Sequence, residues 1–258
     1  MTGLESPVTV PIADCSFCPF RGKTLLMGRC MPGDTCLTVE SGRQIDRFFR
    51  VNPSFAEQYL HDPFWERRAI AVRYAPQKAL VELVNDDDEV VRRAVAYRLP
   101  QSQLELLLND PDREVRMTVA DRIAPEALEK LADDKDYIVR LTVARRLPEG
   151  RLFRLIRDKD VQVRKMVAER LPKVSLGLMV HDDAPEVRRI LAERMESDEA
   201  ASLLNDPDWL VRYTAVQRVA PEALANLLDD PEPDVRSAVQ ERLAKQANST
   251  PKNQEPET

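Results

Sequence analysis

Residues 110–133 read DPDREVRMTVADRIAPEALEKLAD, and residues 134–157 read DKDYIVRLTVARRLPEGRLFRLIR. The second stretch repeats the first in its placement of aspartate, valine-arginine, valine-alanine and a second arginine, without insertion. Eight such units in unbroken register predict a repeat protein, whose core forms only between neighbouring units. The 24-residue interval is marked by Arg68, Arg92, Arg116, Arg140, Arg164, Arg188, Arg212 and Arg236.

Each unit carries two apolar sets at helical spacing. Val115, Val119, Ala120 and Ile123 fall at i, i+4, i+5 and i+8, which is one face of an α-helix. The second set begins twelve residues after each arginine and is shorter. A first helix of about 12 residues leaves too few for a second full helix and two loops, so we expect one or two turns of 3₁₀ helix there. Prolines end the first helix in most units, at Pro76, Pro100, Pro125, Pro148, Pro172 and Pro221.

An aspartate lies six residues before each repeat arginine. In Asp110-Pro111, Asp206-Pro207 and Asp230-Pro231 the aspartate resembles a helix N-cap, with proline at the first helical position. We interpret both columns as structural, with the aspartates capping helices and binding arginines of the same or an adjacent repeat. The aspartates are Asp62, Asp86, Asp110, Asp134, Asp158, Asp182, Asp206 and Asp230.

All four cysteines, Cys15, Cys18, Cys30 and Cys36, precede the repeats in the pattern C-x2-C-x11-C-x5-C. The first residues, MTGLESPVTVPIADC, have neither the basic start nor the apolar run of a signal peptide, so we expect a cytoplasmic chain. Clustered cysteines in a reducing compartment favour a metal site over disulfides. The spacing matches neither paired zinc knuckles nor the common ferredoxin patterns, and leaves zinc and iron–sulfur both open.

The unit D-x-x-x-x-V-R followed by V-A-x-R-L-P and L-x-x-L-L resembles the leucine-rich repeat variant family. The cysteine-bearing segment is similar to that of the family's bacterial iron–sulfur member. The resemblance implies an all-α fold, an α-α superhelix built as a right-handed solenoid of alternating α and 3₁₀ helices. It also implies a small N-terminal domain that binds a [4Fe-4S] cluster, with Cys15, Cys18, Cys30 and Cys36 as the ligands.

We divide the chain into a cysteine-rich cluster domain at 1–50, eight helical repeats at 51–244 and a disordered polar tail at 245–258. A segment of about 50 residues rarely builds a sufficient hydrophobic core without a cross-link such as a metal site. The first repeat would otherwise expose an apolar face, and the cluster domain is expected to cap it. Apolar residues between the cysteines are expected to bury the cluster. They are Phe17, Phe20, Leu25, Leu26, Met27, Met31 and Leu37, and Gly22, Gly28 and Gly33 are expected to let the backbone wrap closely.

The net charge of the chain bears on which classes of partner it can bind. The formal charge is −6, and the repeats carry −7 because the first 50 residues carry +1 and the last 14 none. This balance disfavours nucleic acid, although a second arginine column could grip phosphates if it shared a curved face with the first. Arginines paired with the aspartates would count against that reading. The column consists of Arg98, Arg122, Arg146, Arg170, Arg194, Arg218 and Arg242.

No catalytic motif is evident, so we expect a protein that is not an enzyme, with no small-molecule substrate and no membrane span. His61 and His181 occupy one variable repeat position and are interpreted as loop residues. The predicted function is a [4Fe-4S]-binding scaffold for an unidentified protein partner, with a structural or redox-responsive cluster. The alternative is an electron-transfer protein that docks its partner on the repeats; a zinc-stapled scaffold is a further option.

Overall fold

The computed structural model describes residues 10–249. These residues are helical apart from turns and one isolated β-bridge, between Met31 and Thr35, and contain no strand. They form two compact units that divide between Lys130 and Leu131, and each is described by itself. No helix in this range is long and apolar enough to cross a membrane. The predicted all-α repeat fold is confirmed.

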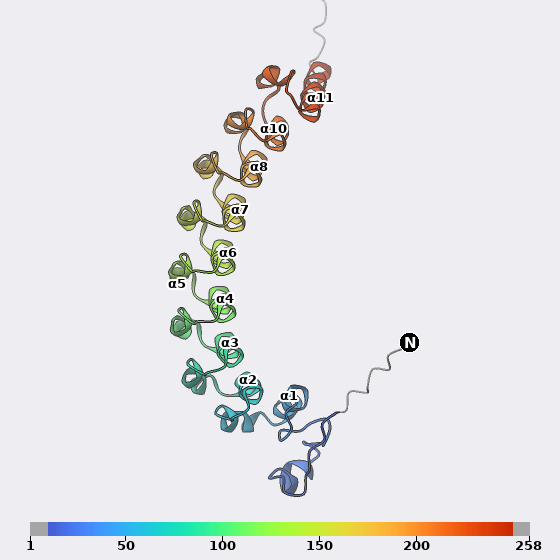
Figure 1. The fold of residues 1–258 in the computed structure, drawn as a ribbon, viewed down its shortest axis with the longest axis vertical. Helices are drawn as coiled ribbons and strands as arrows, with labels where there is room; N and C mark the ends of the chain where they lie inside the picture. The colour runs from blue at the N-terminus through green and yellow to red at the C-terminus, as the bar shows by residue number, and fades with distance from the viewer. Residues whose placement is uncertain (1–9, 250–258) are drawn as a thin grey trace, which may run out of the picture. The chain divides into compact units, whose positions relative to one another are not determined.

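Unit 1 contains the cysteine-bearing segment and the first repeats (Figure 1). The elements are η1 (Arg21–Leu25, a single π-helical turn), α1 (Gly42–Val51), η2 (Pro53–Tyr59), α2 (Trp65–Tyr74), η3 (Gln77–Leu83), α3 (Glu89–Arg98), η4 (Gln101–Leu107), α4 (Arg113–Arg122) and α5 (Pro125–Leu128). Within the repeats of this unit, α2, α3 and α4 are each ten residues long, and a seven-residue 3₁₀ helix follows both α2 and α3, close to the expected division of the unit; after α4 the four-residue helix α5 takes that place.

Unit 2 continues the same alternation after the short helix η5 (Glu129–Leu131). Its last helix runs to Ser249, so the first five residues of the predicted disordered tail are helical; residues 250–258 lie outside the described range. The elements are α6 (Tyr137–Arg146), η6 (Glu149–Leu155), α7 (Val161–Arg170), η7 (Lys173–Met179), α8 (Pro185–Arg194), α9 (Ser197–Ala200), η8 (Ala201–Leu203), α10 (Trp209–Val216), η9 (Pro221–Ala223), η10 (Ala225–Leu227) and α11 (Pro233–Ser249).

Within each unit the α-helices lie side by side in one row, and the short helices form a second row behind them (Figure 1). The core lies between the rows. In α6, Val139, Val143 and Ala144 are fully buried, and so is Leu152 of the following η6. Both predicted apolar sets therefore point inward, and the small alanine suits the close packing of α6 against α7.

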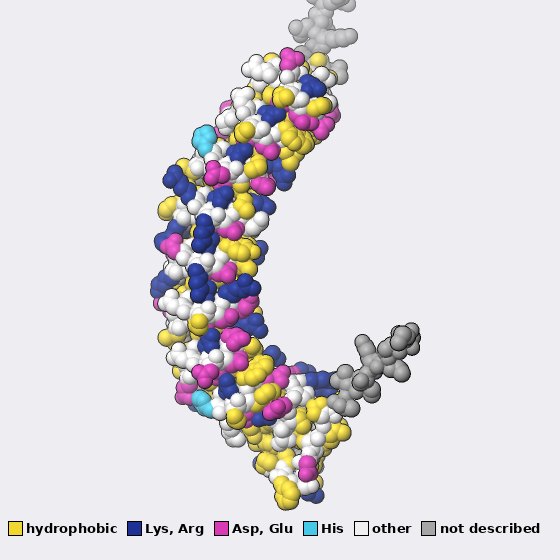
Figure 2. Space-filling view, in the orientation of Figure 1, with side chains coloured by type: hydrophobic (Ala, Val, Ile, Leu, Met, Phe, Trp, Pro, Cys, Tyr) yellow, Lys and Arg dark blue, Asp and Glu magenta, His cyan; other side chains and the backbone are white. Residues whose placement is uncertain are grey.

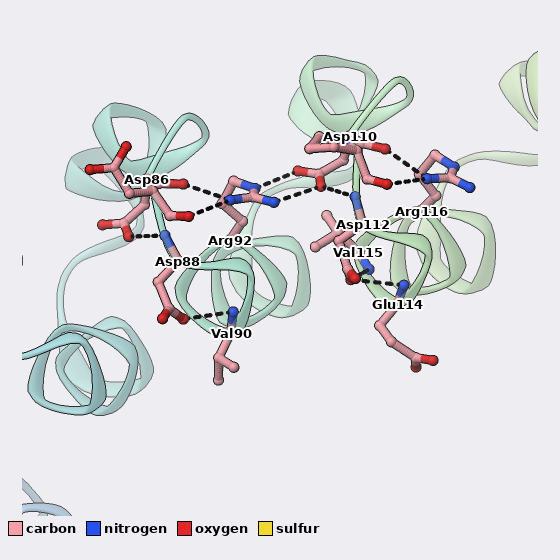
Figure 3. Close-up of polar contacts among 11 residues, drawn as sticks. Asp86, Asp88, Val90, Arg92, Asp110, Asp112, Glu114, Val115 and Arg116 are labelled. Atoms are coloured by element: carbon pink, nitrogen blue, oxygen red, sulfur yellow. Dashed lines mark hydrogen bonds and ion pairs between the residues drawn. The ribbon is translucent and has the colours of Figure 1, made fainter.

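The first arginine column and the aspartate column form a ladder between neighbouring repeats (Figure 3). Arg92 donates through Nε and Nη2 to the two carboxylate oxygens of Asp110, at 2.8 and 3.0 Å, and through Nη1 to the carbonyl oxygen of Asp86, at 2.7 Å. One guanidinium thus joins its own repeat to the next, and the predicted pairing is confirmed. The same fork joins Arg68–Asp86, Arg140–Asp158, Arg164–Asp182, Arg188–Asp206 and Arg212–Asp230.

The N-cap assignment was wrong by two residues. In the repeat of α4 the cap is Asp112, whose carboxylate accepts from the backbone N–H groups of Glu114 and Val115, and the helix begins at Arg113. Asp110 instead accepts from the N–H of Asp112 and from Arg92, so it orders the turn before the helix. Pro111 therefore lies in that turn and not in the helix. The same shift holds for Asp206, where Asp208 caps α10, and for Asp230, where α11 begins at Pro233.

The arginines of the second column donate hydrogen bonds to carbonyl oxygens at the C-terminal ends of α-helices. Arg194 reaches back one repeat and donates to the carbonyl oxygens of Ala168, at 2.6 Å, and Leu171, at 2.9 Å. These carbonyls belong to the last turn of α7, where intrahelical donors run out and the helix dipole favours a cation. Arg98, Arg122, Arg170, Arg218 and Arg242 make equivalent bonds to carbonyls of the preceding repeat.

The Arg212–Asp230 pair of the ladder is expected to be sensitive to acid. Its hydrogen bonds from Arg212 hold the pKa of Asp230 below its ordinary value, so this carboxylate contributes stability above about pH 4 that is lost as pH falls through its folded-state pKa. In chemical denaturation, Asp230→Asn should lower the free energy of unfolding most near pH 6, and the difference from wild type should shrink near pH 3. Asp229→Asn, at the exposed neighbouring position, is the matched control. A difference that is the same at both pH values would contradict this assignment.

Candidate metal centre

Tight turns present the cysteines on the segment before α1. Cys15 and Cys18 flank one turn, in which the N–H of Cys18 lies 3.4 Å from the carbonyl oxygen of Cys15. Cys30 and Cys36 flank another, closed by a 2.8 Å bond from the N–H of Met31 to the carbonyl oxygen of Thr35. Gly28 and Gly33 adopt φ values of 67° and 82°, a region that glycine enters without strain. Two of the three predicted glycine positions therefore shape the loops that carry the thiols.

The four cysteines lie on two turns of the same short segment before α1. Cys30 and Cys36 are buried, and Cys15 and Cys18 are partly exposed. Burial, followed by the charges of Cys36, Cys18 and Cys15, raises the pKa of Cys30 to about 11. Burial and the charges of Cys18 and Cys36 also raise the pKa of Cys15. Because the charges of the other cysteines help to raise the pKa values of Cys15 and Cys30, a cationic centre would favour ionisation of these two thiols.

Four cysteine thiols are the donor set of a [4Fe-4S] cluster and also of a structural zinc ion. A structural zinc ion draws four ligands onto one metal, whereas a cubane bonds each thiolate to a different iron and so accepts sulfurs that are farther apart. Among residues 10–249, no group of three or more His, Cys, Asp or Glu side chains is arranged to hold one metal ion.

Aromatic packing fixes the cysteine-bearing segment to the first helices. The ring of Phe20, just after Cys18, lies edge-on to Phe48 of α1 and Phe55 of η2, with centroids 5.0 and 5.4 Å apart. Asn52, at the end of α1, donates to the carbonyl oxygen of Arg29 at 2.8 Å. The segment thus closes the end of the core of unit 1, as the cap prediction required.

Two polar residues that the repeat pattern does not mark also hold this segment in place. The side-chain amide of Gln44, in α1, donates to the backbone carbonyl oxygen of Pro11. The backbone carbonyl oxygen of Gln44 accepts a hydrogen bond from the N–H of Cys36. Asn52 is the second. Gln44 lies 33 residues from Pro11, and Asn52 lies 23 residues from Arg29. Because neither residue recurs at a fixed interval, no pattern in the sequence indicated these contacts.

The expectation that apolar residues bury the site was wrong in part. Phe20 and Leu37 are buried, but Phe17, Leu26, Met27 and Met31 are exposed to solvent. The segment is too short to fold over itself, so only those side chains that face α1 and η2 can be enclosed. Gly22 has neither a positive φ nor an atom within 4 Å of an added Cβ, and so nothing there requires glycine.

The histidines lie in loops between repeats, as expected for their column. His61 and His181 are both exposed, and Nε2 of His61 lies 3.3 Å from a carboxylate oxygen of Glu82 on the next repeat. Neither lies in the cysteine-bearing segment.

Comparison with known proteins agrees with this geometry. A family model described as "LRV protein FeS4 cluster" matches residues 11–58, which include all four cysteines, and the "Leucine rich repeat variant" model matches residues 90–112 and 138–160. An uncharacterized 27.7 kDa protein in the nifB 3′ region of Rhodobacter capsulatus is 38% identical over 86 residues, which are 33% of this chain and 35% of that protein. The match thus spans about a third of that relative's length.

A solved structure described as a leucine-rich repeat variant with a novel repetitive protein structural motif is similar over nearly its whole length. It is 62% identical in sequence, the alignment covers 90% of this chain and 99% of that one, and the TM-score is 0.84. The chain belongs to the leucine-rich repeat variant family and has its [4Fe-4S] cluster domain.

Proposed function

We propose that this protein is a cytoplasmic, non-catalytic interaction scaffold in which Cys15, Cys18, Cys30 and Cys36 bind the cluster and the cluster holds the cap on the repeats. The observation that supports it most directly is the packing of Phe20 on Phe48 and Phe55, because it makes the cysteine-bearing segment part of the wall of the first repeat's core. When bound, the cluster joins four sites on this short segment and can exchange one electron.

The use of the arginines favours a protein partner over nucleic acid. Guanidinium groups of the first column bind carboxylates of the aspartate column, and those of the second bind helix-terminal carbonyls. Arginines engaged in this way are not available to grip phosphates along the array. What the repeats expose instead are side chains that differ from unit to unit, such as Tyr97 of α3 and Val174 of η7. A constant frame with variable surface residues is typical of repeat proteins that bind other proteins.

Site-specific photocrosslinking tests the scaffold role. A photoreactive phenylalanine analogue at Tyr97 or Val174 should give discrete adducts of higher mass when the protein is irradiated in the cells that produce it. The unirradiated sample is the control. If both positions return only the uncrosslinked chain, the repeats are not an interaction surface.

Electron transfer is the second candidate, because apolar side chains next to the cysteines are open to solvent. Reversible one-electron reduction of the anaerobically purified protein, with an unchanged circular dichroism spectrum, would support it. A cluster that cannot be reduced without loss of iron would leave only the structural role.

A further inference from the structure

The cysteine-bearing segment exposes more large apolar side chains than any other stretch of similar length in the described chain. Of the eighteen large apolar residues that are exposed in residues 10–249, six lie within residues 10–31. Figure 2 shows hydrophobic side chains gathered over this part of unit 1. We call the four that flank the cysteines the apolar patch: Phe17, Leu26, Met27 and Met31, which are 97, 80, 62 and 58% exposed.

A patch of this kind is a docking surface in most soluble proteins, since exposed apolar side chains gain free energy only when something covers them. Methionine and phenylalanine are also the residue types that are enriched where proteins meet. The fold does not cover the patch itself, because Phe20 and Leu37 already fill the contact with α1 and η2.

Charge indicates what kind of surface would cover it. Arg21, Lys23 and Arg29 are exposed around the patch, and none forms an ion pair within the described residues. Asp14 is the single carboxylate in residues 10–31, so the charged side chains around the patch are mainly basic, although the repeats carry −7. A partner face with apolar side chains ringed by carboxylates would match this local charge.

The position of the apolar patch relative to the cysteines indicates which class of protein would bind it. Phe17 lies between Cys15 and Cys18, and Met31 directly follows Cys30. A protein that covers these side chains therefore lies beside the thiols that are the predicted cluster ligands. Proteins with a redox cofactor of their own have a reason to dock there, and small, weak interfaces are typical of such encounters.

We propose that the apolar patch and its basic rim form the docking surface for an acidic one-electron carrier protein. This inference rests on the proposed interaction role and places one contact on the cap instead of the repeats. If Cys15, Cys18, Cys30 and Cys36 hold the cluster, it would exchange one electron with the carrier's cofactor, one being oxidised as the other is reduced, and no bond would be made or broken.

Binding to an acidic plant-type [2Fe-2S] ferredoxin tests the proposal, with the basic protein cytochrome c as the charge-opposite control. Titration calorimetry on the cluster-loaded protein should detect ferredoxin and not cytochrome c, and the affinity should fall from about 0.05 to about 0.5 M NaCl. Leu26→Asp should weaken ferredoxin binding at least about tenfold. Visible absorbance of the cluster checks that the variant is loaded like wild type.

The matched control is Leu178→Asp, since Leu178 is 63% exposed on η7, which lies outside the cysteine-bearing segment. It should bind ferredoxin like wild type. No ferredoxin binding by wild type, unchanged binding by a cluster-loaded Leu26→Asp variant, or loss on Leu178→Asp would each overturn the proposal. So would Leu26-dependent binding to phosphatidylserine vesicles in place of ferredoxin, which would make the patch a membrane contact. None of these results affects crosslinking from the repeats, so the scaffold role is judged separately.

Discussion

Removal of the cluster is expected to unfold the cap and loosen the first helices, while residues 131–249 stay folded. Without the metal, Cys15 and Cys30 have raised pKa values and stay protonated at neutral pH, and the four sulfurs no longer join their two loops. The remaining links between the segment and α1 and η2 include the aromatic contacts of Phe20, an ion pair between Arg47 and Asp34, and a few hydrogen bonds. Structural metal sites contribute on the order of 10 kcal/mol to domains of this size, so the loss exceeds what those contacts supply.

Hydrogen exchange detected by mass spectrometry measures the effect region by region. After anaerobic treatment with an iron chelator and an oxidant, protection in α1 and η2 should fall by at least about 100-fold, which corresponds to about 2.7 kcal/mol. Cys30→Ser, which removes one buried thiol, should give the same pattern. Peptides from α7 to α11 are the internal control. Unchanged protection in α1 after complete loss of iron would show that the cluster is not structural.

The second large effect is expected from Arg188→Ala. Arg188 donates to both carboxylate oxygens of Asp206, at 2.7 and 2.8 Å, and both residues are buried. Without the guanidinium, the carboxylate of Asp206 keeps the hydrogen bond from the backbone N–H of Asp208, at 2.9 Å, and its charge remains away from water. Removing one partner of a buried ion pair lowers the free energy of unfolding by about 3–5 kcal/mol. Urea unfolding should therefore detect a decrease of that size.

Arg188→Lys and Arg145→Ala complete the experiment. Lysine retains the charge but cannot form the two-pronged contact. The decrease in the free energy of unfolding should therefore be smaller for Arg188→Lys than for Arg188→Ala. Arg145 is exposed on α6, and its replacement should change stability by less than about 0.5 kcal/mol. If Arg188→Ala costs no more than Arg145→Ala, the ladder does not stabilise the array.

The repeats were predictable because each interaction in them recurs. A column such as Arg92 and its equivalents samples the same environment in unit after unit, and so the pairing with aspartate could be inferred from the coincidence of two columns. The N-cap was assigned to the wrong residue because Asp110 and Asp112 both precede α4, and the choice between them depends on Arg92, which lies 18 residues before Asp110.

The cap was harder to read because it occurs once. The cysteine pattern indicated a metal site, and the family resemblance rather than the spacing favoured [4Fe-4S]. The exposure of Phe17 and Met31 could not be inferred, since burial there depends on which side of an irregular loop faces α1. Hydrophobic character alone does not report that orientation.

The ladder also bears on how such a chain can lengthen during evolution. Each two-pronged contact of the ladder joins an arginine to an aspartate 18 residues later, and the same arginine donates to the backbone carbonyl of the aspartate six residues earlier. Duplicating or deleting one whole 24-residue unit leaves every such pair intact. Inserting a single residue within a unit shifts one partner out of reach. Growth by complete units is therefore tolerated far better than small insertions, and the gene can change length only in steps of 72 nucleotides without breaking the ladder.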